Sequence, residues 1–499
     1  MEYLFDKLVA GMKGVLRKMG LLRTLKDIKE HKKIAVSDSD YTNIDLWKSE
    51  YMNTAQRLNL SYKHNGNRIR RHKRTLKLPK ITARYMSKLV FNEKATFEID
   101  DKGADEFLKK TLDDNGFYKN FKRYLEYGMA LGGFVMKVYH DGNKNVKISY
   151  ATADAFYPLS NDSEHIDECV IPNSFQKGDK FYTLLEWNEW EDDKYVVTNE
   201  LYESYNANEI GNKVPLSLLY KDLKPRVEFD GLSRPFFVYL KPNIANNFNL
   251  TSPLGISVYA NATDTIDIID TMYDSFEREF VLGKKRIMVP SSMIKTTMKN
   301  GEMIQYFDTE DEAFHVFNSI NDDAKIIADV SVEIRAEEFI SSINAMLKIF
   351  AVEVGLSAGT FTFDENGIKT ATEVISEKSE TFQTKNEHSL LVDEALKELF
   401  ISIIEVGKLI GAYEGNLIKK SNISIDFDDS IADDDDTRIN RWTNAKNQGM
   451  VPLIIALQRA HKITEKEAEL WVKMIRDDEQ AGRGITDVEA SQLFGGIEE

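Results

Sequence analysis

Residues 259–280 read YANATDTIDIIDTMYDSFEREF, and two side-chain patterns run through them. Apolar residues recur at alternating spacings of three and four, which predicts one helix over about 256–282 with a continuous apolar side. These residues are Tyr259, Ala262, Ile266, Ile269, Tyr273, Phe276 and Phe280. The second line of residues is offset from the first and acidic throughout: Asp267, Asp270, Asp274 and Glu277. Such a helix packs on neighbours along one side and presents charge along another.

Downstream, the helical pattern breaks and then resumes. Residues 285–333 predict a small insert, with strands at 286–289, 303–307 and 313–317. A second helix is expected at about 334–355, followed by a stretch with three glycines up to Lys369. Thr370 and Glu373 then form a capping box, so a long helix begins there and runs to about Ala412. Its first half is polar and its second half apolar, and a strand at 423–427 follows it.

Upstream, residues 1–250 predict one mixed α+β domain. Two hairpins stand out, one formed by 134–139 and 146–150 and one by 181–190 and 194–205. No alternation of strand, helix and parallel strand is present, so the sequence gives no case for a doubly wound sheet.

A basic stretch lies at residues 63–77, before the helix-like segment 81–90. Two interpretations remain open: it contacts a phosphate backbone, or it pairs as a charged loop with the acidic surface of a neighbour. Its cations are Lys63, Arg68, Arg70, Arg71, Lys73, Arg74 and Lys77.

Length and composition limit the class of protein. The chain has 499 residues, enough for about three domains of roughly 150 residues each. Its net charge of −16 argues against a tight, non-specific nucleic-acid binder, which normally carries a basic field. No apolar run approaches the roughly 20 residues that cross a bilayer. Cys169 is the single cysteine, so an internal disulfide and a thiolate zinc cage are both excluded.

The N-terminal segment is amphipathic and basic. Leu4, Leu8, Met12 and Met19 recur at helical spacing beside several lysines and arginines. The pattern is typical of a helix that lies on a membrane surface, and also of a terminal helix that docks on a neighbouring element. We favour the second interpretation and expect no membrane partner.

Familiar enzyme motifs are missing from the sequence. There is no GxxxxGK[ST], HExxH or GxSxG pattern, so a P-loop, a zincin helix and a nucleophile elbow are not expected. Residues 128–133, GMALGG, lack the spacing of a nucleotide-binding loop and predict a turn from helix to strand.

An acidic cluster at Asp426–Asp436 supports the strongest enzymatic alternative. Carboxylates at a strand end hold two metal ions in nucleases and polymerases. The competing interpretation is a solvated loop whose aspartates cap the next helix. The alternative function is therefore a metal-dependent nucleic-acid enzyme, whereas our main expectation is no enzyme, no metal and no cofactor.

The order of these elements resembles the portal proteins of tailed bacteriophages, particularly the siphophage type of Gram-positive hosts. Local likeness is greatest in KITARYMSKLVFNE at 80–93, SPLGIS at 252–257 and TATEVISEKS at 370–379. The resemblance implies an α+β portal fold with a wing, an α-helical stem, a small α/β clip, a tunnel loop and a helical crown. It covers nearly the whole chain, although it has no short diagnostic motif.

The resemblance also implies the domain boundaries. The wing is expected at 1–255, the stem helices at 256–283 and 334–355, and the clip at 284–333. The tunnel loop follows at 356–370. A long helix with a return to the wing covers 371–431, and the crown covers 432–499.

Site residues follow from the same resemblance. The tunnel loop places Gly359, Thr360, Phe361, Thr362, Phe363, Asn366 and Lys369 nearest the DNA. The stem acids Asp267, Asp270, Asp274 and Glu277 are expected to line the channel. The apolar residues Tyr259, Ile266, Ile269, Tyr273 and Phe276 are expected at the ring interface. Partner-binding residues of the clip are Lys295, Lys299, Glu302, Glu310 and Asp311.

The partners implied are further copies of the chain in a ring of about twelve, which a heterologous interface closes. Double-stranded DNA passes through the ring without sequence-specific contacts. The terminase large subunit, a head–tail adaptor, and the major capsid and scaffolding proteins are the other partners. The ring is expected in the virion, and in the host cytoplasm during assembly. An acidic channel wall repels the DNA backbone from all sides and lets the duplex slide, so the negative charge is compatible with this role.

Overall fold

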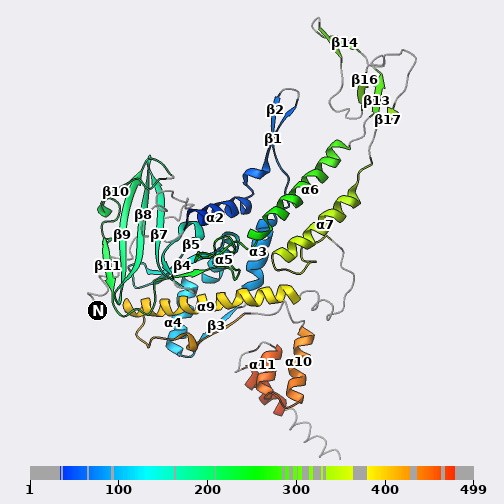
Figure 1. Ribbon diagram of the computed structural model, residues 1–499. Coiled ribbons are helices and arrows are strands. Elements are labelled where there is room, and N and C mark those ends of the chain that lie inside the picture. Colours follow the sequence, from blue (N-terminus) through cyan, green and yellow to red (C-terminus); the bar gives the residue numbers. More distant parts are fainter. Residues whose placement is uncertain are drawn as a thin grey trace, which may run out of the picture. The chain divides into compact units, whose positions relative to one another are not determined.

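The computed structural model describes most of the chain (Figure 1). The described residues are 34, 37–64, 67–91, 95–161, 165–207, 209–283, 287–290, 296–299, 302–305, 314–317, 328–329, 333–363, 379–427, 435–461, 463 and 467–477. The chain divides into two compact units: Met1–Ile368 with Glu377–Phe427, and Lys369–Ser376 with Asp428–Glu499. Each unit is described on its own below.

Five helices form the body of the first unit, and local sequence fixes their ends. The N-cap of α4 is Asp101, whose carboxylate accepts the N–H of Ala104 at 2.8 Å. Gly116 and Gly132 border α5, and both adopt the left-handed conformation that glycine permits. The helices are α2 (Asp38–Tyr51), α3 (Leu78–Val90), α4 (Lys102–Asp114), α5 (Phe117–Leu131) and α9 (Ser379–Leu409).

The larger sheet of the body has six strands. Its order is β10-β9-β8-β7-β6, and β11 also pairs with β9. The pair β8–β9 is the predicted second hairpin, with Trp187 opposite Thr198. The strands are β6 (Tyr157–Asn161), β7 (Ile166–Lys177), β8 (Lys180–Glu191), β9 (Lys194–Ser204), β10 (Asn212–Val214) and β11 (Arg226–Phe229).

A three-stranded sheet lies beside α9. Its order is β12-β4-β5, and the antiparallel pair β4–β5 is the predicted first hairpin. The strands are β12 (Phe237–Leu240), β4 (Phe134–His140) and β5 (Val146–Thr152). A separate pair joins β3 (Thr96–Ile99) to β18 (Ile423–Asp426), which confirms the strand expected after the long helix.

Helix α9 contacts β12 and β4 and supplies much of the core. The apolar second half expected from the sequence is confirmed, because Leu396, Leu399, Phe400, Ile403 and Ile404 are all buried. The polar first half differs from expectation. Thr381, Lys385 and His388, at spacings of four and three, are buried as well. His388 Nδ1 accepts the N–H of Asn243 at 3.0 Å, and burial lowers the pKa of His388 to about 4.

Two further helices and a set of short strands complete the first unit. Helices α6 (Thr263–Leu282) and α7 (Ala336–Glu353) lie side by side (Figure 1). The chain leaves along α6, forms the strands, and returns along α7. Helix α6 begins later than predicted because a 3₁₀ turn occupies Ala260–Ala262.

The three strands predicted between α6 and α7 are confirmed as β13, β15 and β16, and the structure adds β14 and β17, which were not predicted. Strand β13 pairs with β16 in parallel and with β17 in the antiparallel sense, while β14 and β15 form a hairpin. They are β13 (Ile287–Pro290), β14 (Thr296–Lys299), β15 (Glu302–Gln305), β16 (Phe314–Phe317) and β17 (Ala328–Asp329).

Helices make up the described part of the second unit: α10 (Asp435–Asn447), α11 (Leu453–His461) and a helix at 467–477. Gly449, in the left-handed region at φ 72°, makes the turn between α10 and α11. The mixed α+β class expected from the sequence is confirmed, whereas the domain boundaries implied by the resemblance remain predictions. None of the helices in the described residues has the length and hydrophobicity of a membrane span.

Candidate functional site

The basic stretch of the sequence folds against α6. One of the two interpretations made it a charged loop, but it forms an antiparallel hairpin of β1 (Asn59–His64) and β2 (Asn67–His72), followed by residues 73–77. A 3₁₀ turn, Gln56–Leu58, leads into it. Cations of the turn, hairpin and following segment pair with the acidic residues of α6. We call this set of ion pairs the clamp: Arg57, Arg71, Lys73 and Arg74 with Asp267, Asp270, Asp274 and Glu277.

Arg57 is the centre of the clamp. Its Nε and Nη2 donate to the two carboxylate oxygens of Glu50, each at 2.7 Å. Its Nη1 donates to Asp267 and its Nη2 to Asp270, each at 2.9 Å. The planar guanidinium therefore joins α2 to two successive turns of α6, a geometry that a point charge such as lysine cannot reproduce.

Arg71 makes the second large contact of the clamp. Its Nη1 and Nη2 donate to the two oxygens of Asp274, both at 2.5 Å. Lys73 Nζ donates to Asp267 at 2.8 Å, and the backbone N–H groups of Arg74 and Leu76 donate to Asp274 and Asp270.

The pKa values of the two buried carboxylates of the clamp, Asp270 and Asp274, are shifted in opposite directions. The hydrogen bonds from Arg71 hold the pKa of Asp274 below its ordinary value. Burial raises the pKa of Asp270, even though Arg57 acts in the opposite direction. The Arg71–Asp274 pair therefore depends on ionisation of its acid, as do the contacts of Asp267, whose pKa Lys73 and Arg57 lower despite partial burial.

The clamp corrects the expectation that the acidic line faces a DNA channel. Asp270 and Asp274 are only 2% and 5% exposed, because cations of the same chain cover them. Asp267 and Glu277 are partly exposed but are also paired within the chain. Arg71, Lys73 and Arg74 match neither interpretation of the basic stretch, because the acidic surface that they meet belongs to their own chain and not to DNA or a neighbour.

The apolar line of α6 also differs from expectation. Tyr259, Ile266 and Ile269 are fully buried in the core of their own chain, and the Tyr259 hydroxyl donates to the carbonyl of Trp47 at 2.9 Å. These three residues therefore cannot form a ring interface. Tyr273 and Phe276 are half-buried, and the Phe276 ring packs on Phe339 of α7, with 5.3 Å between ring centroids.

Other apolar residues of the helix pair remain exposed. Ile268 of α6, and Ile340, Ile349 and Val352 of α7, each expose between 44% and 52% of their surface. The spacing of three and four in the sequence identified only one side of α6, and Ile268 lies outside it. The signal was present: Ile266, Ile268 and Ile269 cannot all point to the same side of a helix.

Reciprocal hydrogen bonds join the segment that follows α7 to the start of α9. The Ser357 N–H donates to Thr381 Oγ1 at 2.9 Å, and the Thr381 N–H donates back to Ser357 Oγ at 3.3 Å. Of the expected tunnel-loop residues, Phe361 packs against Tyr85 and Phe350, whereas Phe363 is 62% exposed. Gly359 and Thr360 lie in the turn that leads to Phe361, and Thr362 lies between the two phenylalanines. Asn366 and Lys369 lie outside the described residues.

The expected clip residues are only partly described. Lys299 and Glu302 lie directly opposite each other in the β14–β15 hairpin. Lys295, Glu310 and Asp311 lie outside the described residues, as does the N-terminal amphipathic segment up to residue 33. Their roles remain predictions.

The acidic cluster of the enzymatic alternative gains no support. Asp426 ends β18, where it lies opposite Thr96, and residues 428–434 are outside the described part of the chain. Within the described residues, no group of three or more His, Cys, Asp or Glu side chains could hold a metal ion.

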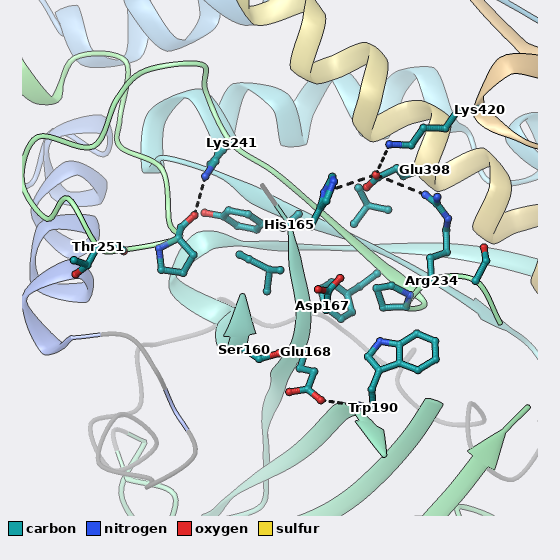
Figure 2. A pocket seen from close by; sticks show the side chains of 18 of the residues that line it. Ser160, His165, Asp167, Glu168, Trp190, Arg234, Lys241, Thr251, Glu398 and Lys420 are labelled. Atoms are coloured by element: carbon teal, nitrogen blue, oxygen red, sulfur yellow. Dashed lines mark hydrogen bonds and ion pairs between the residues drawn. The ribbon is translucent and has the colours of Figure 1, made fainter. Parts of the chain in front are cut away.

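A cavity of about 840 Å³ lies in the body, between β7, β12 and α9. Figure 2 shows His165, Arg234 and Lys420 converging on the carboxylate of Glu398. The Lys420 contact is 2.8 Å, and the other two are 3.8 Å. This arrangement is a set of ion pairs around one carboxylate and shows no nucleophile paired with a base, so it gives no basis for assigning a reaction.

The clamp makes a prediction about pH. Replacing Asp274 with asparagine removes the charge that Arg71 contacts, and at pH 7 we expect the first unit to lose roughly 2 kcal/mol of unfolding free energy. Because the folded pKa of Asp274 lies below its ordinary value of 3.8, its ionic contribution is present above that value and disappears at lower pH. The difference between variant and wild type should therefore shrink below pH 3.8.

The measurement is amide protection of α6 by hydrogen exchange, across a pH series. Asp222→Asn, at an exposed position, is the control and should change stability by less than about 0.5 kcal/mol. A loss from Asp274→Asn that is equally large at pH 3 and pH 7 contradicts an ionic role for Asp274.

Comparison with models of known protein families identifies one family that matches this chain. A family model described as phage portal protein, SPP1 Gp6-like, matches residues 30–481. That range covers more than half of the chain and extends from before α2 to beyond the helix at 467–477. No curated protein matches the sequence.

Proposed function

Because this chain belongs to the SPP1 Gp6-like family of phage portal proteins, we propose that it forms the ring through which double-stranded DNA enters and leaves the capsid at one vertex. Membership in the family implies an oligomeric ring, a place in the virion capsid and a structural, non-enzymatic role. We further propose that DNA passes through the ring, that the ring carries docking surfaces for other proteins, and that the phage is a siphophage of a Gram-positive host.

The observation that carries the proposal is the unfinished packing of the α6–α7 pair. Part of the pair packs on the body and the clamp, while Ile268 of α6 and Ile349 and Val352 of α7 remain about half-exposed. Two-helix layers with exposed isoleucine and valine gain stability when a neighbour covers them. In a ring each subunit supplies that cover to the next, and no open end remains.

We therefore propose that the ring interface involves these exposed residues and not the apolar line of α6. The proposed acidic channel wall is replaced too, because the acids of α6 belong to the clamp. The clamp instead holds α6 to the hairpin and α2, so that twelve or so copies present their helices at one angle.

Phe363 is the described tunnel-loop residue best placed to reach DNA. Its side chain is exposed. Its backbone N–H donates to Asn344 Oδ1 of α7 at 3.0 Å, and this hydrogen bond holds the backbone of Phe363 against α7. Phe361 acts as an anchor instead, since its ring is packed between Tyr85 and Phe350. The strands between α6 and α7 are the proposed docking surface for the terminase large subunit and later the head–tail adaptor.

Glutamate at an exposed position of the helix pair tests the interface. We expect Ile349→Glu to prevent ring formation, since burying a charge without a partner costs several kcal/mol at each of the repeated contacts. Leu218→Glu, at a similarly exposed position in the body, is the control and should leave the ring intact. Native mass spectrometry and negative-stain imaging count the subunits. A wild-type chain that stays monomeric at high concentration, over a range of salt, contradicts the ring itself.

A further inference from the structure

A group of buried polar side chains joins the three-stranded sheet of the body to the six-stranded sheet. Lys137 belongs to β4 of the first sheet, and Glu186 and Asn188 belong to β8 of the second. Only 6%, 3% and 0% of their respective surfaces are exposed. Neither the clamp nor the proposed ring uses these residues, although burying a charged pair so deeply is costly.

Glu186 holds the other two side chains together. Its Oε1 accepts a hydrogen bond from Lys137 Nζ and a second one, at 3.1 Å, from Asn188 Nδ2. Because both nitrogens bind one oxygen atom, the amine of Lys137 and the amide of Asn188 lie within two hydrogen-bond lengths, about 6 Å, of each other. A lysine and an asparagine are thus brought together, with a carboxylate between them that can carry protons.

Tyr195 binds the carbonyl end of the asparagine. Its hydroxyl donates to Asn188 Oδ1 at 2.9 Å and accepts the backbone N–H of Phe236 at 3.3 Å. Because the Phe236 N–H occupies a lone pair of the hydroxyl oxygen, the hydroxyl hydrogen is directed at the amide carbonyl. A donor placed there stabilises the negative charge that develops on the carbonyl oxygen when a nucleophile attacks the carbon.

The surroundings of these groups are aromatic and closed to water. Tyr195 is fully buried, and its ring packs edge-on against Trp190 and Phe236, with 5.1 and 4.9 Å between ring centroids. Buried charges are disfavoured in such a medium. Transfer of a proton from the Lys137 ammonium to Glu186 removes both charges and leaves a neutral amine, which is a nucleophile.

We propose that Lys137 and Asn188 join in an isopeptide bond, which the folded chain forms by itself with Glu186 as general acid and base. The lone pair of the Lys137 amine attacks Asn188 Cγ, and the carbonyl electrons move onto Oδ1, where the Tyr195 hydroxyl stabilises them. Glu186 passes its proton to Nδ2 and takes up a proton from Nζ. The Cγ–Nδ2 bond then breaks, the carbonyl re-forms and ammonia leaves. The products are one amide bond, ammonia and protonated Glu186, so the step needs no oxidant or other co-reactant.

Mass spectrometry of the denatured full-length chain tests the proposal. Wild type should be lighter than its sequence by the mass of one ammonia molecule, and its tryptic digest should contain a branched peptide that joins Lys137 to Asn188. The branched peptide is the decisive readout, because cyclisation at an Asn-Gly pair such as Asn115-Gly116 also releases ammonia. All groups belong to one chain, so the bond forms in a monomer as well as in a ring, and the outcome is independent of the proposed function.

Three variants separate the roles, measured as the fraction of chain that carries the branched peptide at successive times after synthesis. Glu186→Gln keeps the shape of the side chain but removes the proton carrier, and should slow bond formation about a hundredfold or more. Tyr195→Phe keeps the ring and removes the donor to Oδ1, and should slow it about a hundredfold. Glu203→Gln is the matched control and should form the bond at the wild-type rate, because Lys180 and Glu203 make a more exposed pair, at 2.6 Å, on the same hairpin.

Amide protection of β8 by hydrogen exchange shows which variants fold. A branched peptide that forms in wild type and slows in a protected Glu186→Gln or Tyr195→Phe chain supports the proposal. A wild-type chain that never contains the branched peptide overturns the bond. Equal rates in wild type and in both protected variants overturn the roles given to Glu186 and Tyr195.

Discussion

Replacing Arg57 with alanine is expected to destabilise the first unit by about 4 kcal/mol, more than any other single change to the clamp. Arg57 is the shared partner of Glu50 and Asp270, whose side chains are only 5% and 2% exposed. Without the guanidinium, two buried carboxylates face each other with no cation between them. Breaking a buried pair by removing one partner is costly for this reason, even where the intact pair adds little.

The loss caused by Arg57→Ala should also depend on pH. Burial already raises the pKa of Asp270, and removing Arg57 raises it further, so the folded variant takes up a proton more readily than the unfolded chain. Stability of the variant relative to wild type should therefore recover as the pH falls from 7 towards 5. This recovery occurs in a higher pH range than the one expected for Asp274→Asn, because the two acids have pKa values shifted in opposite directions.

Arg226→Ala is the matched control for Arg57→Ala. Arg226 also makes two hydrogen bonds to one carboxylate, that of Glu191, at 2.8 and 2.5 Å, but both side chains are about half-exposed. An exposed pair of this kind contributes little to stability, because solvent screens it. Because the chain has two units, the readout is amide protection of α6 and β9 individually and not one global melting curve. Equal losses from Arg57→Ala and Arg226→Ala contradict the role given to burial.

The sequence predicted which residues of α6 share a side, but not what covers each side. The spacing of Tyr259, Ile266 and Ile269 identified an apolar line correctly, and the structure buries it as expected of any such line. The residues that bury this apolar line can come from the same chain or from another copy. Here they come from the same chain, through contacts between residues more than 200 positions apart in sequence, such as Tyr259 and Trp47. Periodicity within one helix carries no information about such a contact.

The same limit applies to charge. The acidic line of α6 and the basic stretch at 63–77 were both recognised, yet their pairing was missed because nearly 200 residues separate Lys73 from Asp267. The buried polar residues of α9 were missed for another reason: polar side chains predict an exposed side, although His388 is buried and bonded to Asn243. Hairpins such as β4–β5 were predicted well, since their partners are adjacent in sequence and a turn joins them.

Two glycines join the body of the first unit to the segment that leads into α6. Gly132, at the C-terminal end of α5, and Gly255 cross so closely that a Cβ on either would lie within about 2.5 Å of the other's carbonyl oxygen. The adjoining backbone is bonded as well, because the Val258 N–H donates to the carbonyl of Met129 at 3.0 Å. Gly132 also has φ +87°, in the region that residues with a side chain rarely adopt.

Gly132→Ala is expected to cost about 4 kcal/mol, of which the backbone conformation accounts for roughly 1 and the contact with Gly255 for the rest. Two other substitutions separate these contributions. Gly231 has φ +75° with no atom within 4 Å of the added Cβ, so Gly231→Ala should show the conformational cost alone. Gly255→Ala places its Cβ 2.4 Å from the carbonyl oxygen of Gly132 and 2.7 Å from Lys241 Cβ, without a left-handed φ, so it should show a steric cost without the conformational one. Hydrogen-exchange protection of α5 and α6 measures all three. If Gly132→Ala and Gly231→Ala lose equal stability, the crossing at Gly255 is not what holds α6 to the body; if Gly132→Ala and Gly255→Ala both release α6 while α5 stays protected, the crossing is the joint on which the position of the helix pair depends.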